Sequence, residues 1–167
     1  SWDAAKVRRA FPQTLGQNGS TVMLVRLEHA NLCVHDIDGV VRFLLTAFPE
    51  FKTRRDTTEA DGSRWVHVGL DETYIALTQA NPDAAKRGTP YKGRSGLNHV
   101  AFEVDDVASV RERLSAAGFQ DSTFPNAHPF RQGIYFYDPD GKDWEFVQYL
   151  SEDREKRHDY EMPDQSA

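Results

Sequence analysis

Apolar and polar residues follow the same order twice along this chain. A short β-forming segment, His-Ala-Asn-Leu-Cys-Val, starts at His29, and a second, His-Val-Ala-Phe-Glu-Val, starts at His99. Each segment leads to an aspartate, Asp36 or Asp106, of the kind that caps a helix. Shifting the sequence against itself by 70 positions aligns the two segments and their aspartates. The pattern therefore predicts two structurally similar halves.

An amphipathic helix is predicted after each aspartate, because apolar residues recur there at helical spacing. Pro49 ends the first predicted helix and Gly118 ends the second. A hairpin follows each helix, from 64–69 into 74–78 and from 134–137 into 144–149. The helical stripes are Val40, Val41, Phe43, Leu44 and Phe48 in the first half, and Val107, Val110, Leu114 and Ala117 in the second.

These elements predict an α+β fold of two paired βαβββ modules. Because one such half cannot close its own sheet, we expect the two to meet edge to edge in a curved eight-stranded cup with a concave ligand site. The charged C-terminal tail is expected to be a solvated surface or, as an alternative, a partner contact. The predicted boundaries are an N-terminal extension 1–23, a single domain 24–150 with modules 24–79 and 96–150 joined by an exposed linker 80–95, and the tail 151–167.

The composition fits one ordinary globular domain and excludes several classes of protein. The chain has 167 residues and a formal net charge of -6, so a nucleic-acid partner is not expected. No apolar run approaches the roughly 20 residues that span a bilayer, and no signal-peptide core is visible. The single cysteine, Cys33, fits a reducing compartment. We therefore expect a cytoplasmic protein that is not bound to a membrane.

Three side chains are predicted to hold one divalent metal ion. His29 and His99 occupy matching positions in the repeat, and Glu145 lies on the last predicted strand of the second half, where the first half has Ala76. Two imidazoles and one carboxylate leave coordination positions open for substrate and oxygen, as in catalytic metal sites. Glu28 is expected to point away from this site by strand alternation.

Three phrases make the chain resemble the vicinal oxygen chelate superfamily over residues 24–150. They are Leu-Glu-His-Ala-Asn-Leu at 27–32, Gly-Leu-Asn-His-Val-Ala-Phe at 96–102 and Asp-Pro-Asp-Gly-Lys-Asp-Trp-Glu-Phe at 138–146. This superfamily includes glyoxalase I, fosfomycin-resistance transferases, bleomycin-binding proteins and extradiol dioxygenases. The resemblance implies the paired-module fold, a divalent metal, a small-molecule substrate and a homodimer.

The segment from Asn126 to Glu145 resembles the signature of the extradiol dioxygenases. That resemblance implies Fe(II) or Mn(II), with Zn(II) or Ni(II) as further possibilities, held in part by Glu145. It also implies that His128 lies near the substrate and that Tyr135 donates a hydrogen bond to a substrate oxygen. The leading hypothesis is thus ring cleavage of a catechol-like chelating substrate. Such enzymes often carry four modules and a further active-site histidine, whose place His67 could take.

Two other hypotheses stay open at this stage. The first is a glyoxalase-like lyase or isomerase, or a resistance transferase, although Ala76 stands where glyoxalase I has a fourth metal ligand. The second is a non-catalytic protein that sequesters a drug or other ligand in the cup. Retention of both histidines and Glu145 favours an enzyme over a sequestering protein. The aromatic residues that could line such a pocket are Trp65, Tyr74, Phe102, Tyr135 and Trp144.

Overall fold

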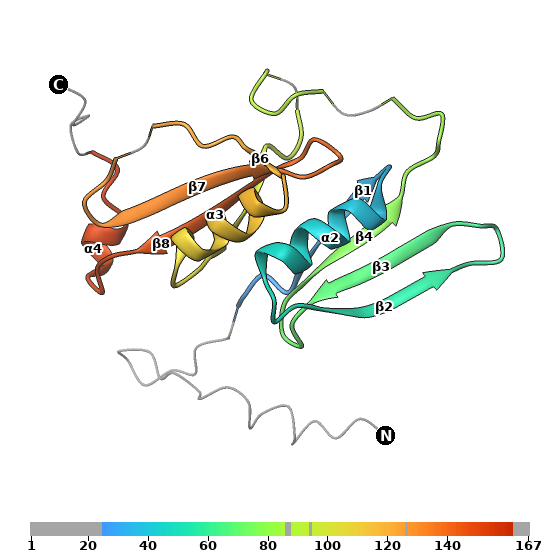
Figure 1. Cartoon of the computed structure of the whole chain (residues 1–167), viewed down its shortest axis with the longest axis horizontal. Helices are drawn as coiled ribbons and strands as arrows, with labels where there is room; N and C mark the ends of the chain where they lie inside the picture. The colour runs from blue at the N-terminus through green and yellow to red at the C-terminus, as the bar shows by residue number, and fades with distance from the viewer. Residues whose placement is uncertain (1–24, 86–87, 94, 126, 162–167) are drawn as a thin grey trace.

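The computed structural model describes residues 25–85, 88–93, 95–125 and 127–161 (Figure 1). The predicted N-terminal extension 1–23 and the last residues of the tail lie outside this part of the chain. Within it, no helix has the length and apolar character required to cross a bilayer.

The first module contains the predicted strand, helix and three further strands. The four strands form one mixed sheet in the order β1-β4-β3-β2, with β1 and β4 parallel. Its elements are β1 (His29–Val34), α2 (Ile37–Ala47), β2 (Lys52–Thr58), β3 (Arg64–Gly69) and β4 (Tyr74–Gln79).

The second module repeats this topology. Its sheet has the order β5-β8-β7-β6, again with the first and last strands parallel, although β6 has only two residues. Its elements are β5 (His99–Glu103), α3 (Val107–Ala116), β6 (Gln120–Asp121), β7 (Arg131–Tyr137) and β8 (Asp143–Tyr149), followed by the short helix α4 (Arg154–Arg157).

Both helices begin where the sequence predicted. The side chain of Asp36 accepts a hydrogen bond from the backbone N–H of Gly39 at 2.8 Å, and that of Asp106 accepts one from Ser109 at 3.1 Å. Each aspartate thus satisfies a donor that the first helical turn leaves free. Gly118 follows α3 with a φ of 81°, a left-handed conformation that favours glycine.

Strand register confirms the internal repeat at single positions. Asn31, the third residue of β1, lies opposite Ala76 on β4. Ala101, the third residue of β5, lies opposite Glu145 on β8. On the neighbouring strands, Ala76 faces His67 and Glu145 faces Tyr135. The predicted equivalence of Ala76 and Glu145 is therefore correct, and His67 is the counterpart of Tyr135.

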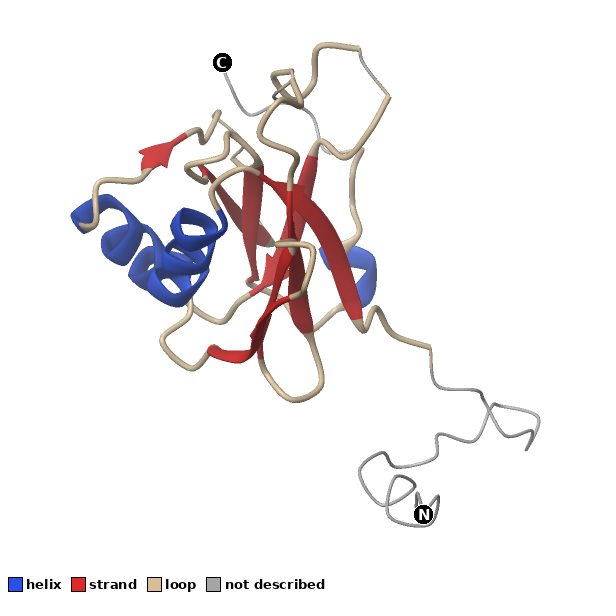
Figure 2. Ribbon diagram, turned by 90° about the vertical axis from the view of Figure 1, so that its right-hand side faces the viewer, coloured by secondary structure: helices blue, strands red, loops and turns tan. Residues whose placement is uncertain are grey.

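The two modules share one hydrophobic core. Helices α2 and α3 lie on the same side of the sheets (Figure 2). Phe43 of α2 is fully buried, and its ring centroid lies 5.9 Å from that of Trp144 and 6.3 Å from that of Phe146, both on β8 of the other module. The helix of the first module thus helps to cover the sheet of the second, and neither module buries its apolar face alone.

Core packing, not strand pairing, joins the modules within one chain. In the described residues the strands form two separate four-stranded sheets, with β1 and β5 as edge strands. The predicted α+β fold of two βαβββ modules is confirmed. Among the residues that the structure describes, the eight strands of the expected cup are divided between two four-stranded sheets that do not pair with each other.

The charged tail folds back onto the second sheet. Helix α4 lies on the side of the sheets opposite to α2 and α3 (Figure 2). The guanidinium carbon of Arg157 lies 4.0 Å from the ring centroid of Tyr149, and one of its nitrogens lies 2.7 Å from Glu103 Oε1. Most of the described tail is nevertheless exposed, as expected of a solvated surface, and Arg157 anchors it to the face that Tyr149 and Glu103 share.

Asp140, in the turn between β7 and β8, links the modules through polar contacts. Its Oδ1 accepts the backbone N–H of His35 at 2.8 Å and that of Asp36 at 3.3 Å, and its Oδ2 accepts from Lys142 Nζ at 2.7 Å. Burial alone would raise the pKa of this carboxyl group. Lys142 and the backbone donors outweigh burial, so the pKa of Asp140 lies below its ordinary value.

Replacing Asp140 with Asn should lower the free energy of unfolding at neutral pH by about 1–2 kcal/mol, because the charge-assisted bond to Lys142 is lost. A carboxylate with a depressed folded-state pKa contributes stability above its unfolded pKa, and this contribution is lost as the pH falls through the folded pKa. Urea titrations should therefore show the difference at neutral pH and its decline below about pH 4. The control Asp105→Asn, at an exposed position, should stay within about 0.5 kcal/mol. A difference that is equal at pH 3 and pH 7 would contradict this role.

Candidate metal centre

His99 and Glu145 lie side by side on the second sheet. They are on its open face, which is the face turned away from α2 and α3. His99 is the first residue of β5, and Glu145 is the third residue of the adjacent parallel strand β8. His99 Nε2 lies 3.1 Å from Glu145 Oε2, and the two side chains are 34% and 17% exposed. An imidazole nitrogen and a carboxylate oxygen at this separation can bind one cation together, with room for a further ligand from solvent.

Tyr91 holds the other ring nitrogen of His99. The Tyr91 hydroxyl donates to Asp143 Oδ2 at 3.0 Å and lies 2.8 Å from His99 Nδ1. Because its single proton goes to Asp143, the hydroxyl oxygen accepts from Nδ1–H and leaves Nε2 directed at Glu145. Burial and the bond to Asp143 raise the pKa of Tyr91, so the hydroxyl stays protonated. This arrangement is typical of a histidine that binds metal.

The backbone of Tyr91 has a φ of 63°, which is unusual for a residue other than glycine. Such a conformation costs on the order of 1 kcal/mol and persists only where other contacts hold it. One such contact is the hydrogen bond from the Tyr91 N–H to Asn98 Oδ1 at 3.0 Å. The sequence predicts only an exposed linker here, because no sequence pattern signals a left-handed tyrosine directed at a neighbouring strand.

Tyr135, which the resemblance placed near the substrate, lies beside the pair. It faces Glu145 across β7 and β8, and its ring packs edge to face against His99 with centroids 5.8 Å apart. The residue is 6% exposed, and burial together with a hydrogen bond to Glu145 raises the pKa of its hydroxyl. Tyr135 therefore remains a hydrogen-bond donor at neutral pH.

His29 lies in the first module, apart from this pair. Its Nδ1 contacts the carboxylate of Glu28, and its ring stacks on Tyr74 with centroids 4.8 Å apart. Glu28 therefore does not point away from His29, as strand alternation predicted, because it precedes the first residue of β1 and its side chain turns back to the ring. As with His99, Nδ1 is held by a neighbour and Nε2 is the nitrogen left for another ligand.

An aromatic row continues from His29 across the open face of the first sheet. The His67 ring lies 4.6 Å from that of Tyr74 and 4.9 Å from that of Trp65. The guanidinium of Arg54 lies 4.3 Å from the Tyr74 ring centroid, within cation–π range. Burial and Arg54 lower the pKa of His67, so its imidazole is neutral at neutral pH.

His128 is not brought to the pair. Its Nε2 bonds to the backbone carbonyl of Asp159 at 3.0 Å, and its Nδ1 accepts the backbone N–H of Phe130 at 3.1 Å. Both ring nitrogens are thus engaged within the chain. His128 precedes the first residue of β7, Arg131, whereas Tyr135 lies further along that strand.

The predicted site is therefore only partly assembled in one chain. Among the described residues, no three metal-binding side chains come together. The structure unites His99, Glu145 and Tyr135 and adds Tyr91 and Asp143, but it leaves His29 on the other sheet. The physical reason is that each sheet is complete within its own module. A wide groove beside α3, lined by parts of 107–112 and 121–134, contains none of the three predicted ligands.

Comparisons with known proteins agree with this architecture. The family described as Glyoxalase/Bleomycin resistance protein/Dioxygenase superfamily matches residues 26–146. No curated protein matches the sequence closely enough to count as a relative.

Several solved structures share the fold at low sequence identity. The fosfomycin resistance protein FosX from Listeria monocytogenes is 22% identical with a TM-score of 0.61, over 81% of this chain and 97% of that one. FosX from Mesorhizobium loti is 24% identical with a TM-score of 0.53, over 77% and 94%. A glyoxylase/bleomycin resistance protein/dioxygenase domain from Frankia sp. EAN1pec is 22% identical with a TM-score of 0.61, over 76% and 99%.

Tyr91→Phe should separate the role of the hydroxyl from that of the ring. The variant removes the contacts to His99 and Asp143 and should lower the free energy of unfolding by about 1–3 kcal/mol, because Asp143 is buried. Ser122→Ala is the matched control, since Ser122 Oγ donates to the other Asp143 oxygen at 2.7 Å. Imidazole ¹⁵N shifts of His99 should change in Tyr91→Phe and stay constant in Ser122→Ala. Unchanged His99 shifts in both variants would contradict the assigned contact.

Proposed function

Because the chain belongs to the Glyoxalase/Bleomycin resistance protein/Dioxygenase superfamily, we propose that it is a divalent-metal-dependent enzyme. Its substrate would be a small molecule that chelates the metal through neighbouring oxygens. The observation that carries the proposal is the 3.1 Å approach of His99 Nε2 to Glu145 Oε2 on an open sheet face, with Tyr91 holding the other nitrogen. The donor chemistry fits a catalytic metal, since two imidazoles and one carboxylate leave positions for substrate.

His29 is the third ligand in this proposal, supplied by a second copy of the chain. In both histidines an oxygen atom of a neighbouring side chain contacts Nδ1, so Nε2 is the nitrogen that would bind the metal. One chain keeps them on separate sheets with open edges at β1 and β5. A symmetric dimer that brings the open face of one first module to the open face of the other second module would complete two equal sites.

Fe(II) or Mn(II) suits this set of ligands, and Zn(II) or Ni(II) would also bind it. Support for a divalent metal comes from the Listeria FosX structures, one of which holds Mn(II) with 1S,2S-dihydroxypropylphosphonic acid and another Mn(II) with sulfate. Because affinity rises from Mn(II) toward Zn(II) and copper, the metal that purifies with the protein need not be the working one.

The leading reaction is extradiol-type cleavage of a catechol-like substrate by dioxygen. The metal would favour the deprotonated chelate and leave a position for oxygen. Tyr135, buried and kept protonated beside Glu145, would donate a hydrogen bond to the substrate oxygen. His128 has both nitrogens bonded to backbone groups, so its part in this scheme is to shape the site rather than to transfer protons.

A second candidate is a resistance-type reaction on an anionic substrate, similar to that of the fosfomycin resistance proteins. Arg54 favours it, because its guanidinium covers the Tyr74 ring, and Tyr74 in turn stacks on His29. In the proposed dimer this cation would lie within reach of a phosphonate or carboxylate held at the metal.

Mixing two inactive variants tests the shared site. His29→Ala and Glu145→Ala chains should each lose metal binding, measured as Mn(II) per chain by elemental analysis. After joint refolding, random reassortment should restore about a quarter of the sites, because each mixed dimer keeps one intact set. Mixing Glu145→Ala with His99→Ala is the control and should restore none, since both residues belong to the same half-site. No restoration in the first mixture, with a parent that binds metal, would mean that the ligands meet within one chain.

Oxygen uptake with the Fe(II)-loaded protein and catechol distinguishes the reactions. We expect oxygen consumption equal to catechol loss, and a fall of about 10²–10³ in kcat for Tyr135→Phe if its hydroxyl stabilises the bound oxyanion. Phe124→Ala, which removes a ring that contacts Tyr135 with centroids 5.0 Å apart, controls for packing. Fosfomycin consumption by the Mn(II)-loaded protein without oxygen uptake would favour the second candidate. Metal and ligand binding without turnover in either assay would indicate a sequestering protein.

A further inference from the structure

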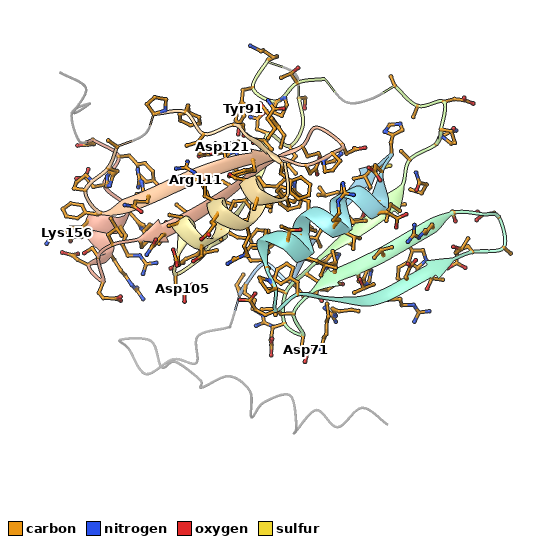
Figure 3. All side chains as sticks on the ribbon, viewed as in Figure 1. Asp71, Tyr91, Asp105, Arg111, Asp121 and Lys156 are labelled. Carbon is orange, nitrogen blue, oxygen red and sulfur yellow. The ribbon has the colours of Figure 1, made fainter. Side chains whose placement is uncertain are left out.

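The open face of the second sheet is bounded at both ends of its strands. At one end Tyr91 contacts His99 and Asp143, the first residues of β5 and β8. At the other end lies the tail with α4. Figure 3 labels Tyr91 and Lys156 at these opposite ends. The proposed ligands His99 and Glu145 lie at and near the Tyr91 end.

Small residues occupy the face between the two ends. Ala101, Gly133 and Val147 share the open face with Glu145 and Tyr135, because opposite partners on neighbouring strands point to the same side. Larger apolar residues of the same strands point to the core. The sheet surface beside Glu145 is therefore covered by small side chains, whereas bulky side chains lie at both ends of the strands. This surface of small side chains is called the floor of the site.

Gly133 has no backbone reason to be glycine, because its φ is not in the left-handed region. A Cβ at this position would meet Glu145 Oε1 at 3.5 Å and Tyr135 Cε2 at 3.9 Å, which are ordinary contacts. The absent side chain therefore leaves free space beside the proposed metal ligand rather than relieving strain.

The tail is attached to its end of the face by several independent contacts. Arg157 pairs with Glu103 and lies over Tyr149, at the far ends of β5 and β8. Arg131 Nη1 donates to the backbone carbonyl of Arg157 at 3.0 Å, and its guanidinium carbon lies 4.3 Å from the Tyr160 ring centroid.

His128 adds a further attachment through its hydrogen bond to the carbonyl of Asp159. The attached segment, 151–161, lies beyond the 26–146 range that the family match covers. This segment contacts the same face as the proposed site.

We propose that residues 151–161 form the end wall of the ligand site and limit the length of the substrate. The proposal rests on the proposed function for the position of the chelated end of the ligand. Tyr149 lies four positions after Glu145 on the same strand, which corresponds to about 13 Å between their Cα atoms. After the side chains are allowed for, the space suits one ring with a short substituent, so a compact chelating ligand is selected over one with a long chain.

Thiol labelling tests the wall without a metal or substrate. Val147→Cys is made in a Cys33→Ser background, because Cys33 is exposed, and is treated with iodoacetamide or with the bulkier fluorescein maleimide. In a chain that ends after Ser151, or in Arg157→Ala, labelling by the bulky reagent should be about tenfold faster or more. Labelling by iodoacetamide should change much less. Arg154→Ala is the matched control, because this exposed arginine of α4 contributes no side-chain contact to the wall. A chain that ends after Glu161 controls for truncation, and both controls should label as the parent does.

Catechols with 4-alkyl chains of one to eight carbons then test ligand length on the metal-loaded protein. The parent should bind catechol and 4-methylcatechol and lose affinity steeply beyond about four carbons, whereas the chain ending after Ser151 should bind all lengths within about threefold. Gly133→Leu should weaken every alkylcatechol without unfolding the chain, because it fills the floor.

Equal labelling rates and the same length profile in the parent and the chain ending after Ser151 would overturn the proposal. Failure of the parent to bind catechol itself would instead count against the proposed function. Labelling would still decide whether the segment covers the face, because that measurement requires no metal.

Discussion

The shared aromatic core is the constraint on which the rest of this structure depends. Each βαβββ module has one apolar sheet face, and its single helix cannot cover that face alone. Phe43 of α2 packs against Trp144 and Phe146 of the other module, so α2 helps α3 to cover the second sheet, with both helices on one side. Burying an aromatic side chain stabilises a core by roughly 3 kcal/mol. This contact holds the modules together without any strand pairing between them.

The position of the candidate site follows from that core. Because the apolar faces are turned toward the helices, the polar faces of both sheets remain open, and His29 and His99 lie on different sheets. In the proposed centre, the second module of one chain would supply a half-site of His99 and Glu145, with Tyr91 and Tyr135 beside them. The first module supplies His29, oriented by Glu28 and Tyr74. Two half-sites with matched imidazole orientation are the physical basis for proposing that a symmetric dimer completes the centre.

Residues outside the repeated strands shape this face. Tyr91 reaches the first residues of β5 and β8 from the linker, at the expense of a left-handed backbone. The tail reaches the last residues of the same strands through Arg157, and Tyr160 contacts Arg131 at the start of β7. The face is thus bracketed by one segment before the second module and one after it. In the proposed site, this floor of small side chains would limit the shape of a ligand beside Glu145.

The sequence by itself determined the parts of this protein that depend on local periodicity. Two helices capped by Asp36 and Asp106, the succession of strands and helix along each module, and the equivalence of Ala76 with Glu145 could all be predicted, because alternation, helical spacing and an internal repeat can be read along the chain. The same repeat predicted that Glu145 lies near His99, whereas Tyr135 was indicated only by the resemblance to extradiol dioxygenases.

Tertiary structure alone decided which faces meet and what covers them. It separated His29 from His99, engaged both nitrogens of His128 with the backbone and brought Tyr91 and the tail onto the second sheet. Such contacts join residues far apart in the chain, and they depend on how two modules share one core. No periodic pattern along the sequence encodes that arrangement.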